Sequence, residues 1–134
     1  MSTVEQIALE ATTTGSAGSA AATVVSPVFT NGAEILRAWY DYHASAPNTT
    51  DVTLYETALG ATLGAIDAKA NSVTDAVRRP RVSSLQDLAG ADLSANEVTE
   101  PYMIPAGGTV TLTVAQSDAL TNAVVCYIQY RRLA

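Results

Sequence analysis

The chain has few of the side chains that carry most enzyme chemistry. Its 134 residues include one cysteine, one histidine and 7 Lys+Arg against 13 Asp+Glu, which gives a formal net charge of −6. Cys126 alone cannot form an internal disulfide, which suits a reducing compartment. The acidic balance excludes a general nucleic-acid binder and disfavours contact with an anionic membrane surface, because both need a surplus of basic side chains. No apolar run reaches the length of a membrane span, and the first residues lack the basic region of a signal peptide, so we expect assembly in a cytosol.

The candidate catalytic and metal-binding residues have no partners at a useful spacing. His43 ends a predicted strand and Cys126 lies within an apolar one, so core packing explains this cysteine better than a Cys–His nucleophile pair does. Asp41, Asp51 and Asp67 could converge on Ca²⁺ at one end of a sandwich, although roles in capping loops suit them better. No phosphate-binding glycine pattern precedes a helix. We therefore expect neither an enzyme nor a protein with a metal or cofactor.

Hydrophobic periodicity predicts strands. The clearest case is 109–115, where Val110, Leu112 and Val114 alternate with threonines, a period of two that is typical of a half-buried strand. Similar patterns predict further strands at 34–43, 51–56, 98–104 and 123–133. Residues 58–67 are compatible with a short strand or a helical turn, and we favour the strand. Pro80 excludes 78–81 from a central strand, and 82–96 is predicted to be a long excursion.

These short strands, with no amphipathic helix longer than a turn or two, predict an all-β fold. The expected architecture is an antiparallel β-sandwich or a jelly-roll-like barrel whose body spans residues 32–134. In its first strand, Leu36, Ala38, Tyr40 and Tyr42 are predicted to share one face. The other face is predicted to carry Ile35 and Trp39, together with polar residues.

Residues 1–31 are predicted to form an extended N-terminal arm. Segment 11–22 consists of small and polar residues with nothing large to bury, and 4–10 could form one or two helical turns that act as an anchor. Ordering each residue of such a segment costs about 1–2 kcal/mol of backbone entropy. Because side chains this small cannot recover that cost within their own chain, we expect neighbouring subunits to order the arm.

The predicted partner contacts combine apolar side chains of the arm, an outward aromatic and arginines around Pro80. Trp39, Ile35 and Tyr55, on predicted outward faces, also support a contact surface, although each could equally lie under a loop of the chain itself. Guanidinium groups suit carboxylates on a partner, but a solvated loop with local ion pairs explains the arginines equally well. The candidate contact residues are Ile7, Leu9, Val24, Val25, Phe29, Trp39, Arg78, Arg79 and Arg81.

Several stretches together resemble a known class of proteins. They are 32–53, which ends in HASAPNTTDVT at 43–53, and then 79–81 (RPR), 102–116 (YMIPAGGTVTLTVAQ) and 124–130 (VVCYIQY). The order of loops and strands in these stretches resembles that of the small β-sandwich structural proteins of tailed bacteriophages. The resemblance implies a virion component without enzymatic residues, above all a capsid decoration or cement protein on the capsid surface, assembled in the host cytoplasm. The partners it implies are the major capsid protein and neighbouring copies of the chain, with a trimer as the expected oligomer.

Two other roles stay open. A head–tail connector or tail-end protein would share the sandwich and the arm but would occur in rings of few copies. A receptor-binding or carbohydrate-binding sandwich would need exposed aromatics beside Asp or Asn. Trp39 and Tyr40 cannot both face out of one strand, so an aromatic platform finds little support in the sequence.

Overall fold

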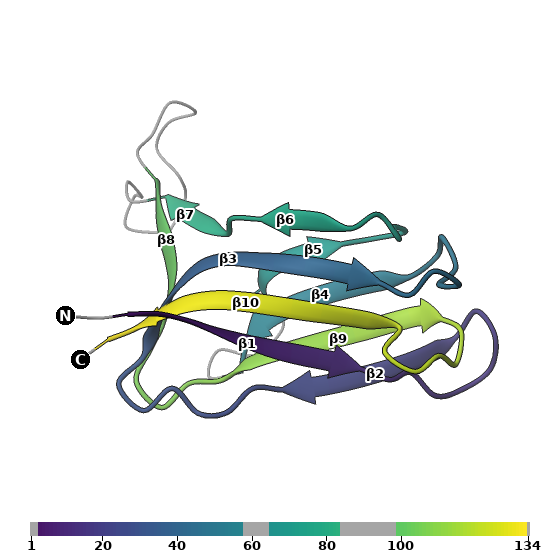
Figure 1. Cartoon of the computed structure of the whole chain (residues 1–134), viewed down its shortest axis with the longest axis horizontal. Helices are drawn as coiled ribbons and strands as arrows, with labels where there is room; N and C mark the ends of the chain where they lie inside the picture. The colour runs from purple at the N-terminus through teal and green to yellow at the C-terminus, as the bar shows by residue number, and fades with distance from the viewer. Residues whose placement is uncertain (1–2, 58–64, 84–98, 134) are drawn as a thin grey trace, which may run out of the picture.

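In a computed structural model, the chain folds into two antiparallel β-sheets packed face to face as a β-sandwich (Figure 1). The structure describes residues 3–57, 65–83 and 99–133. These residues contain no helix, so none in this part of the chain is long and apolar enough to cross a membrane. The predicted all-β sandwich is confirmed.

The two sheets are built from strands that are distant in sequence. The first sheet has the spatial order β1 (Val4–Ala11), β10 (Val124–Arg132), β3 (Ala33–Tyr42), β8 (Thr99–Ile104) and β7 (Arg81–Ser83). Strand β6 (Ala76–Arg78) also pairs with β3, farther along than β8 does. The second sheet has the order β2 (Ala20–Val25), β9 (Val110–Ser117), β4 (Asp51–Glu56) and β5 (Ala65–Lys69). Among the described residues, the short strands on either side of Pro80 lie at the edge of the sheet, which agrees with the expectation that 78–81 is not part of a central strand.

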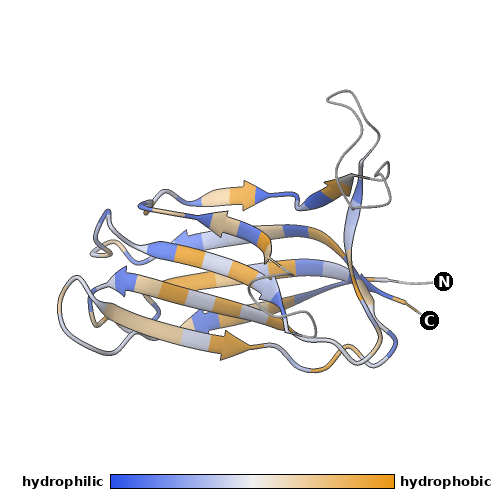
Figure 2. Cartoon of the chain, turned by 180° about the vertical axis from the view of Figure 1, so that it is seen from behind, coloured by the Kyte–Doolittle hydropathy of each residue, from blue (hydrophilic) through white to orange (hydrophobic). Residues whose placement is uncertain are grey.

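Alternation along each strand decides which side chains fill the space between the sheets. On β9, Val110, Leu112 and Val114 are buried, and Val52 and Leu54 of β4 are buried beside them. The predicted inward residues of β10 are all buried as well: Val124, Cys126, Ile128 and Tyr130. Figure 2 shows this alternation as hydrophobic and hydrophilic bands along the strands. Each large apolar side chain that is buried in this way contributes about 1.5–3 kcal/mol.

Strand β3 departs from its predicted facing because it contains a bulge. Tyr130 pairs with Ile35 and Gln129 with Arg37, so the register skips Leu36. An extra residue of this kind shifts the alternation by one position. Tyr40 and its inward neighbours keep their predicted side, but Ile35 is fully buried and Leu36 only half-buried. Ile35 is therefore part of the core and not of a contact surface.

Residues 4–11 and 20–25 are strands of the sandwich and do not form a separate arm. Val4–Ala11 is a strand and not helical turns, and it pairs with β10 along its whole length, while β2 pairs with β9. Leu9, Ala11 and Ala20 are buried. These backbone hydrogen bonds and this burial offset the entropy cost that we assigned to neighbouring subunits. The division into 1–31 and 32–134 is therefore wrong, since each sheet takes one strand from the N-terminal segment.

The glycine-containing loop between β1 and β2 is also held by the chain itself. The backbone N–H of Thr13 donates to the carbonyl of Leu120 at 3.0 Å. The N–H of Gly18 donates to the carboxylate of Asp118 at 2.9 Å. These bonds tie the loop to the turn between β9 and β10, so the small polar residues are ordered without a partner subunit.

Candidate binding face on the outer side of the first sheet

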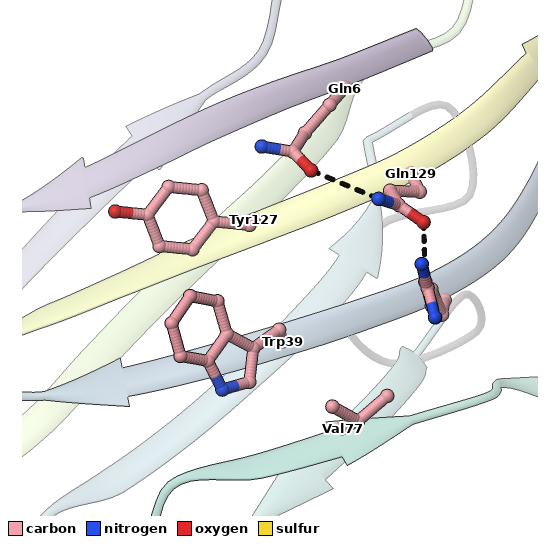
Figure 3. Close-up of a pocket in the computed structure, with 6 residues that line it drawn as sticks. Gln6, Trp39, Val77, Tyr127 and Gln129 are labelled. Atoms are coloured by element: carbon pink, nitrogen blue, oxygen red, sulfur yellow. Dashed lines mark hydrogen bonds between the residues drawn. The ribbon is translucent and has the colours of Figure 1, made fainter. Parts of the chain in front are cut away.

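An aromatic pair lies on the solvent side of the first sheet. Trp39 of β3 and Tyr127 of β10 are direct register partners, and their inward neighbours Tyr40 and Cys126 are buried. Because side chains alternate along a strand, both rings point away from the core. Their centroids are 5.0 Å apart and their planes differ by 22°. Figure 3 looks onto this side of the sheet and shows both rings broadside, and Trp39 is 40% exposed.

A row of polar side chains crosses the same face beside the rings. Gln6 of β1, Gln129 of β10 and Arg37 of β3 are consecutive register partners. The Nε2 of Gln129 donates to the Oε1 of Gln6 at 3.1 Å, and the Nε of Arg37 donates to the Oε1 of Gln129 (Figure 3). Both ends of the central amide are thus held. Gln6 and Arg37 are exposed, so their remaining nitrogen atoms can donate to a ligand.

Val77 of β6 completes this face. It is the register partner of Trp39 and is 49% exposed. Together the six side chains line a shallow hollow of about 210 Å³: Gln6, Arg37, Trp39, Val77, Tyr127 and Gln129. We call this set the outer platform. Its apolar rings can stack against a flat ligand while the amides and the guanidinium bind the edge of that ligand, but none of its side chains is a ready nucleophile.

Of the predicted contact residues, the structure places only Trp39 in the outer platform. Leu9 and Phe29 are 3% and 2% exposed, and Phe29 packs edge-on against Tyr130 with ring centroids 5.0 Å apart. Their prediction as partner contacts is wrong, because both fill the core. Ile7 and Val24 are half-buried against that core. Val25, at the end of β2, is 54% exposed.

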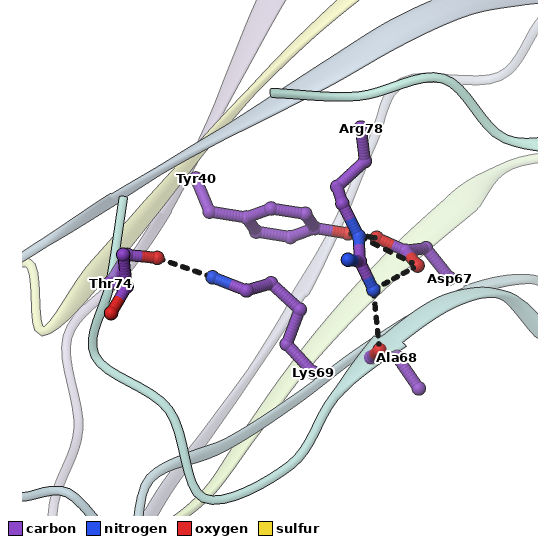
Figure 4. Close-up of polar contacts among 6 residues, drawn as sticks. All are labelled: Tyr40, Asp67, Ala68, Lys69, Thr74 and Arg78. Carbon is purple, nitrogen blue, oxygen red and sulfur yellow. Dashed lines mark hydrogen bonds and ion pairs between the residues drawn. The ribbon is translucent and has the colours of Figure 1, made fainter. Parts of the chain in front are cut away.

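Two of the three clustered arginines bind their own chain. The Nε of Arg78 lies 3.1 Å from the Oδ2 of Asp67, and its Nη2 donates to the carbonyl of Ala68 at 3.1 Å (Figure 4). Arg81 donates to the side chain and the carbonyl of Thr99, both at 2.9 Å. Arg79 is exposed. Local pairing therefore accounts for Arg78 and Arg81, which weakens the prediction that they bind a partner.

Asp67 also anchors a polar cluster between the sheets. The hydroxyl of the fully buried Tyr40 donates to the Oδ2 of Asp67 at 3.0 Å (Figure 4), and burial raises the pKa of Tyr40. The Nζ of Lys69 donates to the carbonyl of Thr74 and lies 4.5 Å from the ring centroid of Tyr42. Burial, aided by the charge of Arg78, lowers the pKa of Lys69. This cluster joins β3 and β6 of one sheet to β5 of the other, which is a structural role.

The carboxylates proposed for Ca²⁺ do not converge. Asp67 is engaged by Arg78, and the Oδ1 of Asp51 accepts the N–H of Asn71 at 2.8 Å, which is a loop-capping role. In the described ranges, no group of three His, Cys, Asp or Glu side chains could hold a metal ion.

Cys126 and His43 do not form a nucleophile pair. Cys126 lies opposite Tyr40 in the core, and burial raises the pKa of its thiol to about 12, so it is neutral at physiological pH. The N–H of His43 donates to the carbonyl of Ala123 at 2.9 Å, farther along the paired strands. Its Nδ1 accepts the N–H of Ser45 at 3.0 Å.

No protein-family model, curated protein or solved structure matches the chain. The functional argument therefore depends on the residues and their geometry.

Sequence reasoning missed five of the six platform residues, because it looked for a second aromatic ring on the strand of Trp39. That ring is Tyr127, from the next strand in the sheet. The alternation at 123–133 already placed Tyr127 and Gln129 on one outward face. Only the register of β10 against β3 could have added that they lie beside Trp39 and Arg37.

Proposed function

We propose that the protein is a non-enzymatic structural component of a tailed-phage virion, a decoration protein that binds the major capsid lattice and neighbouring copies of itself. The resemblance of residues 32–134 to small β-sandwich virion proteins supports the virion role. The attachment we propose differs from the expected arm, because residues 4–11 and 20–25 are strands of the sandwich. The observation that carries the proposal is an edge segment without charge at β2.

Residues 20–28 contain no charged side chain. In the described part of the chain, β2 pairs with β9, and its other edge has only a bridge between Thr14 and Ala21. Val25 and Val28 are 54% and 56% exposed. Native sheet edges are commonly protected by charged side chains, and β1 carries such protection in Glu5 and Glu10. An unprotected edge is suited to an added strand from a partner.

The hydrogen bonds of β2 define which backbone groups face that edge. The N–H of Ser26 donates to Val110 of β9 at 2.8 Å, whereas the N–H of Ala21 donates outward to Thr14 at 3.0 Å. Alternation then directs the backbone groups of Thr23 and Val25 away from β9. Pro27 has no N–H and ends the row of donors. A partner strand would thus bond to Thr23 and Val25 and would cover the exposed valines.

The test uses purified protein and emptied capsids of the phage that encodes it, with occupancy measured by co-sedimentation. Thr23→Pro removes an outward N–H but no hydrogen bond to β9, so it should leave folding intact and weaken capsid binding strongly. Val25→Lys should do the same by adding charge to the edge. Met103→Lys, at a 44% exposed side chain on β8, is the charge-matched control and should bind like the wild type.

Two results would contradict the proposal. Failure of the wild-type protein to bind capsids would remove the decoration role, and full binding by Thr23→Pro would remove the β2 edge. Quantitative mass spectrometry of virions supplies the copy number. A number comparable with that of the major capsid protein supports decoration, and a single ring of copies supports a connector instead.

A further inference from the structure

We propose that the outer platform is a carbohydrate-binding site that takes one neutral, β-linked hexopyranose unit of a glycan. This site lies on the exposed face of the first sheet, whereas the proposed capsid contact is the β2 edge of the second sheet. The two functions are therefore separable by mutation.

The aromatic pair provides the stacking surface. A β-linked hexopyranose with equatorial hydroxyls has a flat face of C–H groups. The electron-rich face of an aromatic ring attracts such weakly positive hydrogens and excludes water from them. Trp39 and Tyr127 have nearly parallel planes, with 22° between them, and Figure 3 shows both rings broadside to the viewer. Val77 extends this apolar area on the side of β6.

The polar row provides the hydrogen bonds that distinguish a sugar from an apolar ligand. Each sugar hydroxyl both donates and accepts, and a side-chain amide offers both functions in one plane. The amide of Gln129 is held from both sides by Gln6 and Arg37. Because this row is ordered before a ligand arrives, less side-chain entropy is lost on binding.

Size favours a single sugar ring, and charge disfavours a polyanion. The hollow of about 210 Å³ is smaller than the roughly 300–1,000 Å³ of sites for drug-sized ligands, which suits a single ring. Arg37 is the only charged residue of the platform, and the chain carries a net charge of −6. These charges disfavour a nucleic acid, which would otherwise also stack on aromatic rings.

Trp39 is the only tryptophan in the chain, so its fluorescence reports directly on ligand stacking. The probes are cellotetraose, N-acetylchitotetraose and lactose, each titrated to about 10 mM and confirmed by calorimetry, a range suited to a shallow site of millimolar affinity. We expect at least one probe to cause a saturable change in emission. Tyr127→Ala should weaken that binding about tenfold or more, and Gln129→Leu should weaken it about fivefold.

Tyr55→Ala is the matched control, because Tyr55 is a half-buried tyrosine on β4 of the opposite sheet and its loss should not change binding. Gln6→Ala is a second variant at an exposed edge position, in case Tyr127→Ala does not fold. Thr23→Pro should bind the sugar normally while failing on capsids, so the two proposals fail separately. Absence of binding by all three probes would overturn the carbohydrate site, as would equal affinities in the platform variants and the wild type.

Discussion

Replacing Asp67 with alanine should destabilise the fold strongly, because this carboxylate serves both sheets. Removing it leaves the hydroxyl of Tyr40, a fully buried residue, without its hydrogen-bond acceptor. An orphaned buried hydroxyl costs about 1–3 kcal/mol. The ion pair with Arg78 adds only about 0–1 kcal/mol, since the Arg78 side chain is 43% exposed. We therefore expect the free energy of unfolding to fall by about 1–4 kcal/mol, a large part of the stability of a small domain.

Urea unfolding, followed by the fluorescence of Trp39, measures this loss as a shift of the midpoint at constant slope. Arg78→Gln removes the exposed ion pair and the hydrogen bond to the carbonyl of Ala68 but leaves the bond between Tyr40 and Asp67. It should therefore cost about 1 kcal/mol, and 1 M NaCl should abolish most of the part that the ion pair contributes. Tyr40→Phe removes the hydroxyl itself and should make a subsequent Asp67→Ala change much less costly. If Asp67→Ala costs no more than Arg78→Gln, the buried hydrogen bond contributes nothing and the reasoning is refuted.

Two further predictions concern single positions. Burial raises the pKa of Cys126 to about 12, from 9.0 in the unfolded chain, so the thiol of the unfolded state loses its proton first. The contribution of the neutral, buried thiol to stability is therefore fully present below pH 9 and is lost as the pH rises towards 12. Cys126→Ala should cost about 1 kcal/mol at pH 7 and should flatten this alkaline fall, which urea midpoints between pH 7 and 11 would show; an unchanged slope would contradict it. Gly32 has φ +84°, and a Cβ there would lie 2.5 Å from the carbonyl oxygen of Ile104. Gly32→Ala should therefore lower stability by about 2–4 kcal/mol by strain and backbone displacement, and a melting temperature equal to that of Gly107→Ala, which meets no atom within 4 Å but shares the positive φ, would contradict the steric part.

The sequence predicts strands well where the pattern is local. Strict alternation at β9 and β10 identified both the strands and their inward residues, because a half-buried strand imposes a period of two on its own side chains. The local pattern did not identify β1 and β2 as strands of the sheets, because their stability comes from pairing with β10 and β9, about a hundred residues away in the chain. An entropy argument that counts only local contacts assigns such segments to a mobile arm.

The candidate site was predictable only in part for a related reason. The outward facing of Trp39 follows from the alternation in β3, but its proximity to Tyr127 depends on how two strands align. The bulge at Leu36 shows how sensitive that alignment is, since one skipped residue moved Ile35 from a predicted contact surface into the core. Neither register nor bulge leaves a clear signal in one sequence.

The position of β10 between β1 and β3 has a consequence for how the protein is made. Both neighbours of β10 are synthesised long before it, so a nascent chain emerging from the ribosome has two strands of the first sheet that cannot yet pair through their shared partner. Closing so large a loop is slow, which places folding in the millisecond-to-second range that is typical of sandwiches dominated by non-local contacts. Until then, the apolar inner side of β3 depends on chaperones or on rapid completion of synthesis for protection from aggregation.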